Sequence, residues 1–390
     1  MRLLVDNARV YNTEQRRCIP GSMLCADGKI IEVNFGPEDK FRRENADYVI
    51  NAGGQCLIPG LVDVHTHGRA GNDFNFADKA AMKEMAHSYA VSGTTSLFPT
   101  LASAPFSELC RAAELIRSLR ADTDGAEFIG IHLEGRYLSP EKRGAHDAGL
   151  LAKPDADELN RFLSFAGLPL HVSAALELDA EGRFAAAAKM AGVTLGLAHT
   201  SATYSQALEA YRMWNVSFTH LYNAMPPLHH RDGGPVLAAF ESGAYAELIC
   251  DGFHICPEMI KFTLGNTGLE RVVLITDSMA AAGAQDGEYM IAGNPAVVRN
   301  GIARTPDGAL AGSTLSLDKA VENFSRFCDI SLADALVCAT ANPAAEVGLD
   351  GTVGCLASGA RADFVICRMD EGQKSLGIRR VFVAGKEITA

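Results

Sequence analysis

The sequence lacks the features that mark membrane, fibrous and disordered proteins. No run of about 18 uncharged apolar residues occurs, so a membrane-spanning helix is not expected. The 390 residues include only 1 Trp, and 48% of them are hydrophobic while 21% are charged. This balance is close to that of an average globular domain and excludes a disordered chain, a collagen and a coiled coil. At roughly 100–200 residues per domain, the length fits two or three domains, or one large α/β barrel with an appendage.

Basic residues and paired cysteines are also scarce. Lys and Arg number 35 against 47 Asp and Glu, and the net charge of −12 argues against non-specific binding to nucleic acid or to an anionic membrane. A local basic pocket can still bind a small anion within this negative field. The N-terminus reaches a charged residue after three apolar ones, so we expect no signal-peptide core. The 10 Cys form no C-x-x-C pair, and we expect reduced thiols and a cytoplasmic protein.

The two ends of the chain share a pattern of short strands separated by turns. The strand candidates are residues 3–5, 8–11, 22–25, 29–33, 362–366 and 380–386. The turn Ala26-Asp27-Gly28 joins two of them as in a β-hairpin. Neither end has enough strands to bury a face by itself. We therefore expect residues 1–54 and 345–390 to form one small β-sandwich domain together.

The middle of the chain alternates short apolar runs with amphipathic segments. The apolar runs are residues 61–67, 94–100, 127–134, 168–176, 193–199, 216–223, 246–252 and 272–277. The intervening helical patterns include residues 79–92, 105–120 and 205–214. Eight such strands alternating with helices predict an α/β fold of the (β/α)₈ TIM-barrel type over residues 55–344. A doubly wound open sheet is the alternative, but residues 64–68 are not the Gly-rich phosphate turn that such a sheet would normally carry.

Polar residues stand at the carboxyl ends of several of these apolar runs. In a barrel those ends meet at one mouth, where such folds place their chemistry. The residues concerned are His65, His67, Glu134, His199, His220 and Asp277. A single histidine at a strand end is more often a structural group, and we interpret His171 and the pair His229-His230 in that way. The set as a whole predicts a divalent metal, and Zn²⁺ suits mixed nitrogen and oxygen ligands.

Three of these positions carry further information. His65 and His67 form an H-x-H pair, whose two-residue spacing directs both rings to the same face of a strand. Asp277 ends the last strand and could take a proton from a metal-activated water and later return it. It could instead cap a helix or form a turn, since Ser278-Met279-Ala280 follow. The surrounding ligand set favours the role of base.

The order of several short motifs resembles a known family. The segments are Pro-Gly-Leu-Val-Asp-Val-His-Thr-His-Gly at 59–68, and residues 132–135, 139–146, 198–200, 219–225, 251–254, 276–279 and 310–313. The first segment is typical of the amidohydrolase superfamily. The combination, in this order over nearly the whole barrel, resembles the N-acetylglucosamine-6-phosphate deacetylases within it.

The resemblance implies a role for each matching position. Glu134, His199 and His220 match the ligands of the principal metal, and His65 and His67 match positions that support a second metal in some members. The expected cofactor is therefore a divalent metal, Zn²⁺, with one or two ions per subunit. Asp277 matches the catalytic acid/base. The positions that match substrate contacts are Ala145, His146, Asn223, Ala224, Asp251, His254, Leu310, Ala311 and Gly312. Arg231 matches an arginine that reaches the sugar phosphate from the neighbouring subunit of a homodimer.

The implied reaction is hydrolysis of the acetamido group of N-acetyl-D-glucosamine 6-phosphate in amino-sugar catabolism. The galactosamine epimer is one alternative, and another amide hydrolysis on the same barrel is a second. Hydantoinase-like members bridge two metals with a carboxylated Lys, and residues 168–176 contain no Lys. The non-enzymatic alternative is a metal-free barrel that acts only as an assembly or binding scaffold. Arg136-Tyr137 replace the usual Pro-Phe after the ligand Glu134, and we expect the Arg136 cation to alter the metal's electrostatics or to help bind phosphate.

Overall fold

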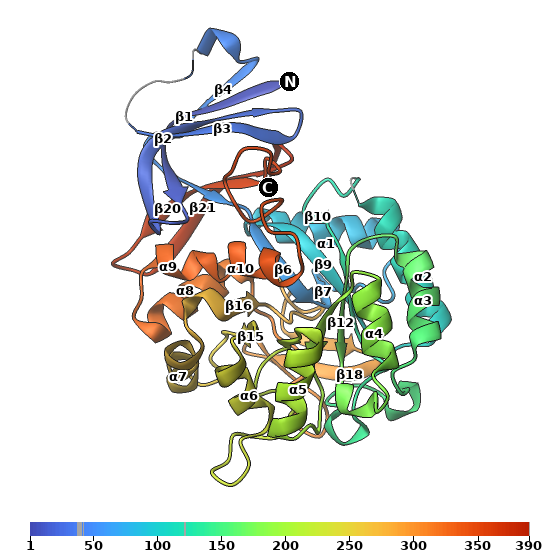
Figure 1. Cartoon of the computed structure of the whole chain (residues 1–390). Helices are drawn as coiled ribbons and strands as arrows, with labels where there is room; N and C mark the ends of the chain where they lie inside the picture. The colour runs from blue at the N-terminus through green and yellow to red at the C-terminus, as the bar shows by residue number, and fades with distance from the viewer. Residues whose placement is uncertain (37–40, 42, 121, 390) are drawn as a thin grey trace.

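Eight parallel strands form the centre of the molecule and alternate with helices along the chain (Figure 1). The computed structural model describes residues 1–36, 41, 43–120 and 122–389. The barrel strands are β6 (Leu61–Thr66), β9 (Thr94–Ala102), β11 (Ile131–Glu134), β12 (Leu170–Ala174), β13 (Thr194–Leu197), β14 (Ser217–Phe218), β15 (Ala246–Ile249) and β16 (Val272–Ile275). The short β10 (Glu127–Phe128) extends the pairing along β9. Each strand coincides with one of the predicted apolar runs, so the predicted barrel is confirmed.

The first and last strands of the barrel are joined by a hydrogen bond at the mouth, and residues 338–339 bridge them at the opposite end. At the mouth, the Asp277 amide donates to the His65 carbonyl at 2.9 Å. At the opposite end, the carbonyls of Cys338 and Ala339 accept hydrogen bonds from Leu274 and Val62 at 2.7 and 3.0 Å. These bonds bring β6 and β16 together in a nearly closed barrel, in which residues more than 200 positions apart are in contact.

Helices surround the strands on the outside of the barrel. They are α1 (Lys79–Val91), α2 (Phe106–Leu119), α3 (Ala156–Ala166), α4 (Arg183–Met190), α5 (Tyr204–Trp214), α6 (Gly234–Ser242), α7 (Pro257–Thr267), α8 (Leu317–Cys328), α9 (Leu332–Val337) and α10 (Ala341–Glu346). In α3 the buried residues Leu159, Phe162 and Ala166 recur at three- and four-residue spacing, which turns one face to the strands. Thr203 and Gln206 form a capping box that begins α5. The three helices predicted at α1, α2 and α5 are confirmed.

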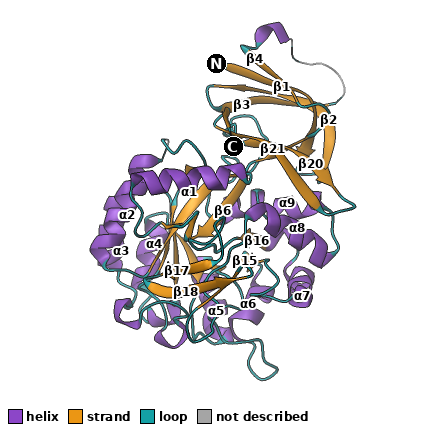
Figure 2. Ribbon diagram, turned by 180° about the vertical axis from the view of Figure 1, so that it is seen from behind, coloured by secondary structure: helices purple, strands orange, loops and turns teal. Residues whose placement is uncertain are grey.

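The two ends of the chain pair into one sheet that lies to one side of the barrel (Figures 1 and 2). Its strands are β1 (Arg2–Asn12), β2 (Arg17–Ala26), β3 (Lys29–Phe35), β4 (Tyr48–Asn51), β5 (Cys56–Pro59), β20 (Phe364–Asp370), β21 (Ser375–Val383) and β22 (Lys386–Ile388). The predicted hairpin around Asp27 joins β2 to β3. The two strands predicted in residues 3–11 are one strand, β1, with a bulge between Val5 and Ala8. The boundaries at 54/55 and 344/345 stay a prediction.

A three-stranded sheet stands beside the barrel mouth and was not predicted from the sequence. It consists of β17 (Gly287–Ile291), β18 (Asn294–Arg299) and β19 (Ile302–Arg304), paired antiparallel. Ile291 and Ala292 are buried with Met279 and Ala102, next to barrel strand ends. A second pair of strands, β7 (Gly68–Arg69) and β8 (Asn72–Asp73), follows β6. Both additions lie where the chain leaves the barrel strands, and the first contributes to the pocket described next.

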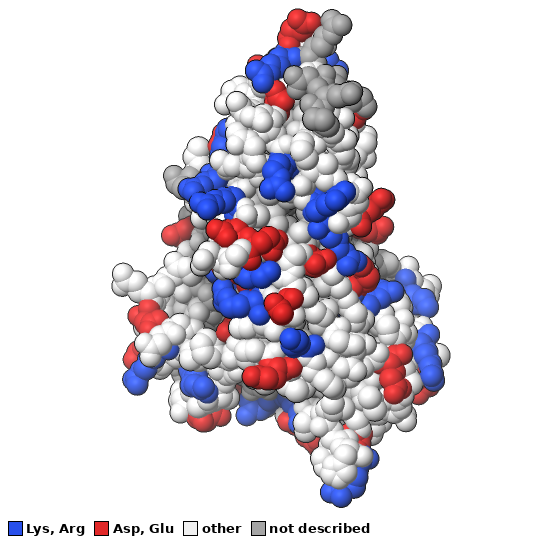
Figure 3. All heavy atoms as spheres, turned by 90° about the vertical axis from the view of Figure 1, so that its left-hand side faces the viewer, with Lys and Arg blue, Asp and Glu red and all other residues white. Residues whose placement is uncertain are grey.

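The surface carries both signs of charge. Figure 3 shows Lys and Arg interspersed with Asp and Glu over the face that it presents. Many of these charges are paired, as in the Arg380–Glu387 ion pair at 2.6 Å. Among the described residues, no helix combines the length and the apolar character needed to cross a membrane.

Candidate active site

The polar residues of the mouth are positioned by the way the barrel strands end. Glu134 is the last residue of β11, and His199, His220 and Asp277 each stand two residues beyond β13, β14 and β16. These three residues have left-handed backbones, with φ values of 42°, 31° and 45°. Non-glycine residues in this region cost ~1–3 kcal/mol each, and such strain is concentrated at functional sites. This left-handed conformation directs the three side chains inward, toward the barrel axis.

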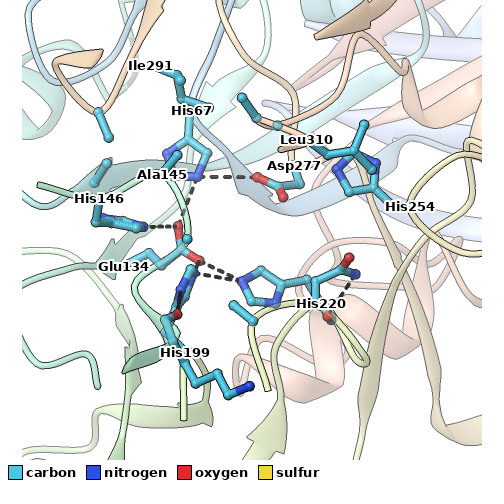
Figure 4. A pocket seen from close by; sticks show the side chains of 18 of the residues that line it. His67, Glu134, Ala145, His146, His199, His220, His254, Asp277, Ile291 and Leu310 are labelled. Carbon is cyan, nitrogen blue, oxygen red and sulfur yellow. Dashed lines mark hydrogen bonds and ion pairs between the residues drawn. The ribbon is translucent and has the colours of Figure 1, made fainter. Parts of the chain in front are cut away.

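Glu134 is the centre of the cluster, and its two oxygens face different groups (Figure 4). Its Oε1 lies 3.2 Å from His199 Nε2 and 2.9 Å from His220 Nε2. Its Oε2 lies 3.0 Å from His67 Nε2 and 3.5 Å from His65 Nε2. All five side chains are buried. The structure therefore brings together all the residues that the sequence predicts as metal ligands.

Asp277 completes the side of the cluster that contains the H-x-H pair. Its Oδ1 lies 3.3 Å from His67 Nε2 and 3.6 Å from His65 Nε2. Burial by itself would raise the pKa of Asp277, but the neighbouring His65 and His67 rings outweigh burial and hold that pKa at about 2. Burial also opposes ionisation of Glu134, while the adjacent histidines hold the pKa of Glu134 well below its usual range. Both carboxylates are therefore ionised at neutral pH.

The histidine hydrogen bonds show which ring nitrogens are free to bind a cation. The Lys142 carbonyl, which can only accept, lies 2.8 Å from His199 Nδ1, so this nitrogen carries the hydrogen and Nε2 keeps its lone pair. The Glu247 carboxylate fixes His65 in the same tautomer through a contact of 3.1 Å to Nδ1. The lone pair of His199 Nε2 faces His220 Nε2 at 3.1 Å. A cluster of nitrogen lone pairs and carboxylate oxygens fits a divalent metal.

The cluster opens into a pocket with a volume of about 380 Å³. Most residues that the sequence predicts as substrate contacts line it, namely Ala145, His146, Asn223, Ala224, His254, Leu310, Ala311 and Gly312. They come from four separate loops on the barrel mouth and beside it. The pocket therefore combines the candidate metal ligands, Asp277 and these residues in one cavity.

Two predicted contacts lie outside the pocket lining. Asp251 is behind His254, and its Oδ2 is 2.7 Å from His254 Nδ1. Asp251 therefore orients the ring instead of reaching into the cavity. Arg231 lies in the exposed loop of residues 226–233, before α6. This loop projects from the body of the molecule in Figure 1, and Figure 3 shows positive charge at the tip of the projection.

The expectation for Arg136 is wrong. Its guanidinium points away from Glu134 and pairs with Glu158 of α3, with Nε 2.8 Å from Oε1. Tyr137 donates to the same carboxylate at 2.9 Å. The reason is the backbone, because φ at Arg136 is 67° and the chain turns outward directly after the ligand strand. Arg136 therefore supplies no charge to the metal cluster and no contact to a phosphate in the pocket.

Sequence reasoning missed several residues that line the pocket. Lys142 and Gly144 lie within the segment 139–146 that carried the resemblance, so their position in the sequence could have pointed to them. Ile291 and Ala292 come from the turn between β17 and β18, and nothing in their sequence signals a site. Lys142 is the one Lys or Arg among the described residues that line this pocket.

Comparison with known proteins agrees with the fold. The model of the amidohydrolase family matches residues 56–388. N-acetylgalactosamine-6-phosphate deacetylase of Escherichia coli O157:H7 is 34% identical over 98% of this chain and 98% of its own. N-acetylglucosamine-6-phosphate deacetylase of Bacillus subtilis (strain 168) is 31% identical over 94% of this chain and 93% of its own.

Solved structures extend this similarity to the arrangement of the whole chain. A mutant N-acetyl-D-glucosamine-6-phosphate deacetylase of Mycobacterium smegmatis, in complex with N-acetyl-D-glucosamine-6-phosphate, has a TM-score of 0.87 and 31% identity, covering 100% of this chain and 99% of that one. The enzyme of the same name from Pasteurella multocida has a TM-score of 0.89 and 26% identity, covering 99% of both chains. The chain therefore belongs to the amidohydrolase family, whose members are metal-dependent hydrolases.

Proposed function

We propose that the protein hydrolyses the acetamido group of N-acetyl-D-glucosamine 6-phosphate to give D-glucosamine 6-phosphate and acetate, in amino-sugar catabolism. The observation that carries this proposal is that Glu134, His199, His220 and Asp277 line one pocket. The carboxylates of Glu134 and Asp277 lie 3.0–3.6 Å from the Nε2 atoms of the H-x-H pair. The named relatives, which are deacetylases of N-acetylhexosamine 6-phosphates, support the choice of substrate.

The mouth cluster would hold Zn²⁺, with one or two ions per subunit. Glu134, His199 and His220 would bind the principal ion, and His65 and His67 would contribute to a second. A bound divalent ion polarises a carbonyl group and lowers the pKa of a coordinated water toward 7. The orientation of His65 and His199 suits this role, because each ring is held through Nδ1 and directs Nε2 toward Glu134.

Asp277 would move the proton during the reaction. Its low pKa leaves the carboxylate ionised at neutral pH, so it can accept a proton from the water that attacks the acetyl carbon. The same group then returns the proton to the sugar nitrogen as the carbon–nitrogen bond breaks. An amine leaves far more readily in its protonated form, which is why a single carboxylate works in both directions.

His146 and His254 would orient the substrate from opposite sides of the pocket. The Ser103 amide donates to His146 Nδ1 at 3.3 Å, so the hydrogen of this neutral ring is on Nε2, which faces the cluster. Burial is the main reason that the pKa of His146 falls to about 3. His146 is therefore a hydrogen-bond donor for the acetyl oxygen. His254, held by Asp251, would contact the sugar or its phosphate, with Asn223 and Ala224 on the adjacent loop.

The 6-phosphate would be bound by Arg231 of a neighbouring subunit in a homodimer. Arg231 lies outside the pocket of its own chain, on the projecting loop, which is the geometry expected of a residue that acts in trans. A guanidinium binds a phosphate dianion through two parallel hydrogen bonds. Asn223, Ala224 and the segment Leu310, Ala311 and Gly312 would enclose the sugar within the chain itself.

N-acetyl-D-galactosamine 6-phosphate is a second candidate substrate. It is favoured by the similarity to the relative from Escherichia coli, which is 34% identical to this chain and is named N-acetylgalactosamine-6-phosphate deacetylase. The two sugars differ in the orientation of one hydroxyl group, so the same metal cluster and the same Asp277 serve both.

Acetate release tests the proposal and separates the two sugars. Purified protein is incubated with each N-acetylhexosamine 6-phosphate, with and without added Zn²⁺ and other divalent ions. The expected result is metal-dependent release with a higher kcat/KM for the glucosamine substrate. Unphosphorylated N-acetylglucosamine is the control for phosphate recognition and should react poorly. A higher kcat/KM for the galactosamine substrate would shift the assignment to the second candidate, and no release from either would overturn both.

We also propose that the protein works in the cytoplasm. All ten cysteines are free, and most of them are buried in the barrel or in the terminal sheet. Free thiols persist in reducing compartments, whereas extracellular proteins commonly oxidise theirs. Cell fractionation with an antibody against the chain tests this location.

A further inference from the structure

A second cluster of polar groups lies at the floor of the barrel, below the metal cluster of the mouth. We call it the floor cluster, and it consists of His171 of β12, Glu247 of β15 and Glu346 at the end of α10. One ligand atom of each lies within 4.8 Å of the other two. His171 and Glu247 are fully buried and Glu346 is 7% exposed. TIM-barrel interiors are usually filled by branched apolar side chains, so two carboxylates here need a compensating partner.

His171 presents a lone pair to this cluster. His171 Nδ1 lies 2.9 Å from Thr194 Oγ1, and it donates to this hydroxyl in the tautomer in which Oγ1 donates in turn to the Leu170 carbonyl, 3.5 Å away. Nδ1 then carries the hydrogen, and Nε2 is unprotonated. Burial lowers the pKa of His171 to about 4, so the ring is neutral at neutral pH. The free Nε2 faces a carboxylate of Glu247 at 4.0 Å.

Most of the acceptor atoms of the floor cluster are unpaired. His171 Nε2, Glu247 Oε1 and both carboxylate oxygens of Glu346 have no hydrogen-bond partner. The hydroxyl of Ser217 lies beside Glu346 and can donate to one of these oxygens, which opposes the rise in the pKa of Glu346 that burial and the Glu247 carboxylate cause. Buried polar atoms are almost always paired, so several orphaned acceptors turned toward one another indicate a missing positive group.

We propose that the floor cluster binds a divalent cation, distinct from the metal of the mouth. A bound divalent cation would oppose the raised pKa of Glu346 and balance the charge of both carboxylates, and the lone pair of His171 completes a mixed nitrogen and oxygen set suited to Zn²⁺ or Mn²⁺. The separation of 4.0 Å between His171 Nε2 and Glu247 Oε1 leaves room for an ion bonded to both at about 2.1 Å. A single proton cannot satisfy all the acceptors at once.

The floor cluster adjoins a surface pocket of its own. Glu346 and Ser217 line a surface pocket of about 140 Å³ at the end of the barrel opposite the mouth. Thr194, which fixes the tautomer of His171, lines the same pocket. This pocket shares no lining residue with the catalytic pocket, so the floor cluster is approached from the opposite end of the barrel.

The decisive measurement locates the ion. Crystals of the whole chain are soaked in Mn²⁺, and diffraction is recorded on both sides of the manganese absorption edge. The expected result is an anomalous peak between His171, Glu247 and Glu346, separate from any peak beside Glu134. Glu346→Gln, which keeps the volume and removes the charge, should abolish the floor peak and leave the mouth unchanged. A wild-type crystal with density at the mouth alone would overturn the proposal and leave a shared proton as the positive group.

Metal content provides a second measurement in solution. After dialysis against Zn²⁺ or Mn²⁺, Glu346→Gln and His171→Asn should each bind one ion per chain fewer than the wild type. Glu322→Gln is the matched control, because Glu322 is a buried carboxylate whose oxygens are already paired with the Leu376 amide and Lys319. Equal metal content in all four proteins would contradict the proposal. If neither floor variant folds, the wild-type diffraction data decide.

Discussion

The two ends of the barrel interior place carboxylates and imidazoles in very different settings. At the mouth, Glu134 is surrounded by ring nitrogens at 2.9–3.5 Å, and the cluster opens into the large pocket. At the floor, His171 and Glu247 are 4.0 Å apart and closed in by the barrel strands. The same residue types therefore form a reactive site at one end and a closed ion site at the other.

The backbone explains this difference. The mouth residues His199, His220 and Asp277 lie beyond their strands in left-handed conformations, which direct their side chains to one point. His171 and Glu247 lie within regular strands, where side chains can only alternate between the inside and the outside. Chemistry that needs several groups in contact is therefore possible where the strands end, and the strained backbone there is part of how the site is built.

One contact joins the two ends. Glu247 Oε1 faces the floor, while its Oε2 lies 3.1 Å from His65 Nδ1 and accepts from the His220 amide at 3.2 Å. Glu247 is thus a positioning residue for the mouth and a ligand for the proposed floor ion. Substitutions at one end alone test whether the two ends act independently, and a substitution of Glu247 tests whether they are coupled.

The largest effect is expected from changing the mouth alone. Asp277→Asn removes the group that accepts and returns the proton, and acetate release should fall by ~10³-fold. The metal should remain, because Glu134, His199 and His220 are unchanged. Steady-state kinetics and metal content on the same preparation check both expectations, with the anomalous peak at the floor as an internal control. Turnover close to that of the wild type would remove Asp277 from the mechanism.

A smaller effect is expected from the residue shared by both ends. Glu247→Gln keeps the volume but removes the charge that holds His65 in its tautomer, and such a change lowers metal affinity by ~10–100-fold. Competition with a fluorescent zinc chelator measures the affinity of the mouth, and Glu322→Gln is the control for replacing a buried carboxylate. An unchanged affinity would show that the mouth does not depend on the floor.

The sequence was sufficient for the barrel and for the residues at its mouth. Parallel strands covered on both faces are continuous apolar runs, and the polar residue that ends such a run marks the mouth. His65, Glu134 and Asp277 could be placed together in this way although more than 200 positions separate the first from the last. The same rule does not reach the floor, where His171 in mid-strand is indistinguishable from a structural histidine.

Other features depend on contacts that the sequence does not reveal. The strands β17–β19 are short and half-exposed, so their alternation is too weak to separate them from a loop. The direction of Arg136 is decided by its left-handed backbone and by Glu158, 22 positions further along the chain. The role of Arg231 depends on a second subunit. In each case the missing information is a long-range contact and not a local preference.

A weaker effect at the mouth is expected from the residue behind His254. Burial lowers the pKa of His254, but the Asp251 carboxylate outweighs it and raises that pKa above its usual value. Asp251→Asn should therefore lower the pKa of His254, which NMR titration of the ring can follow. Because the charged pair stabilises the fold only while His254 is protonated, the loss of stability in Asp251→Asn should be fully present below pH ~6.5 and should disappear as pH rises through the raised pKa. If the pKa of His254 is unchanged in Asp251→Asn, Asp251 does not set the protonation of this ring.

The smallest effect on activity is expected outside both clusters, at Arg136. Its pair with Glu158 is largely buried and stands behind the ligand strand, so Arg136→Ala should leave kcat and KM within about threefold of the wild type. Stability should fall by ~1–3 kcal/mol, because Glu158 loses a charged partner and keeps only Tyr137. Thermal unfolding and kinetics on the same sample separate the two effects, and Glu158→Gln should lower stability in a similar way. A large fall in kcat with unchanged stability would instead mean that Arg136 acts on the metal cluster, which its orientation toward α3 argues against.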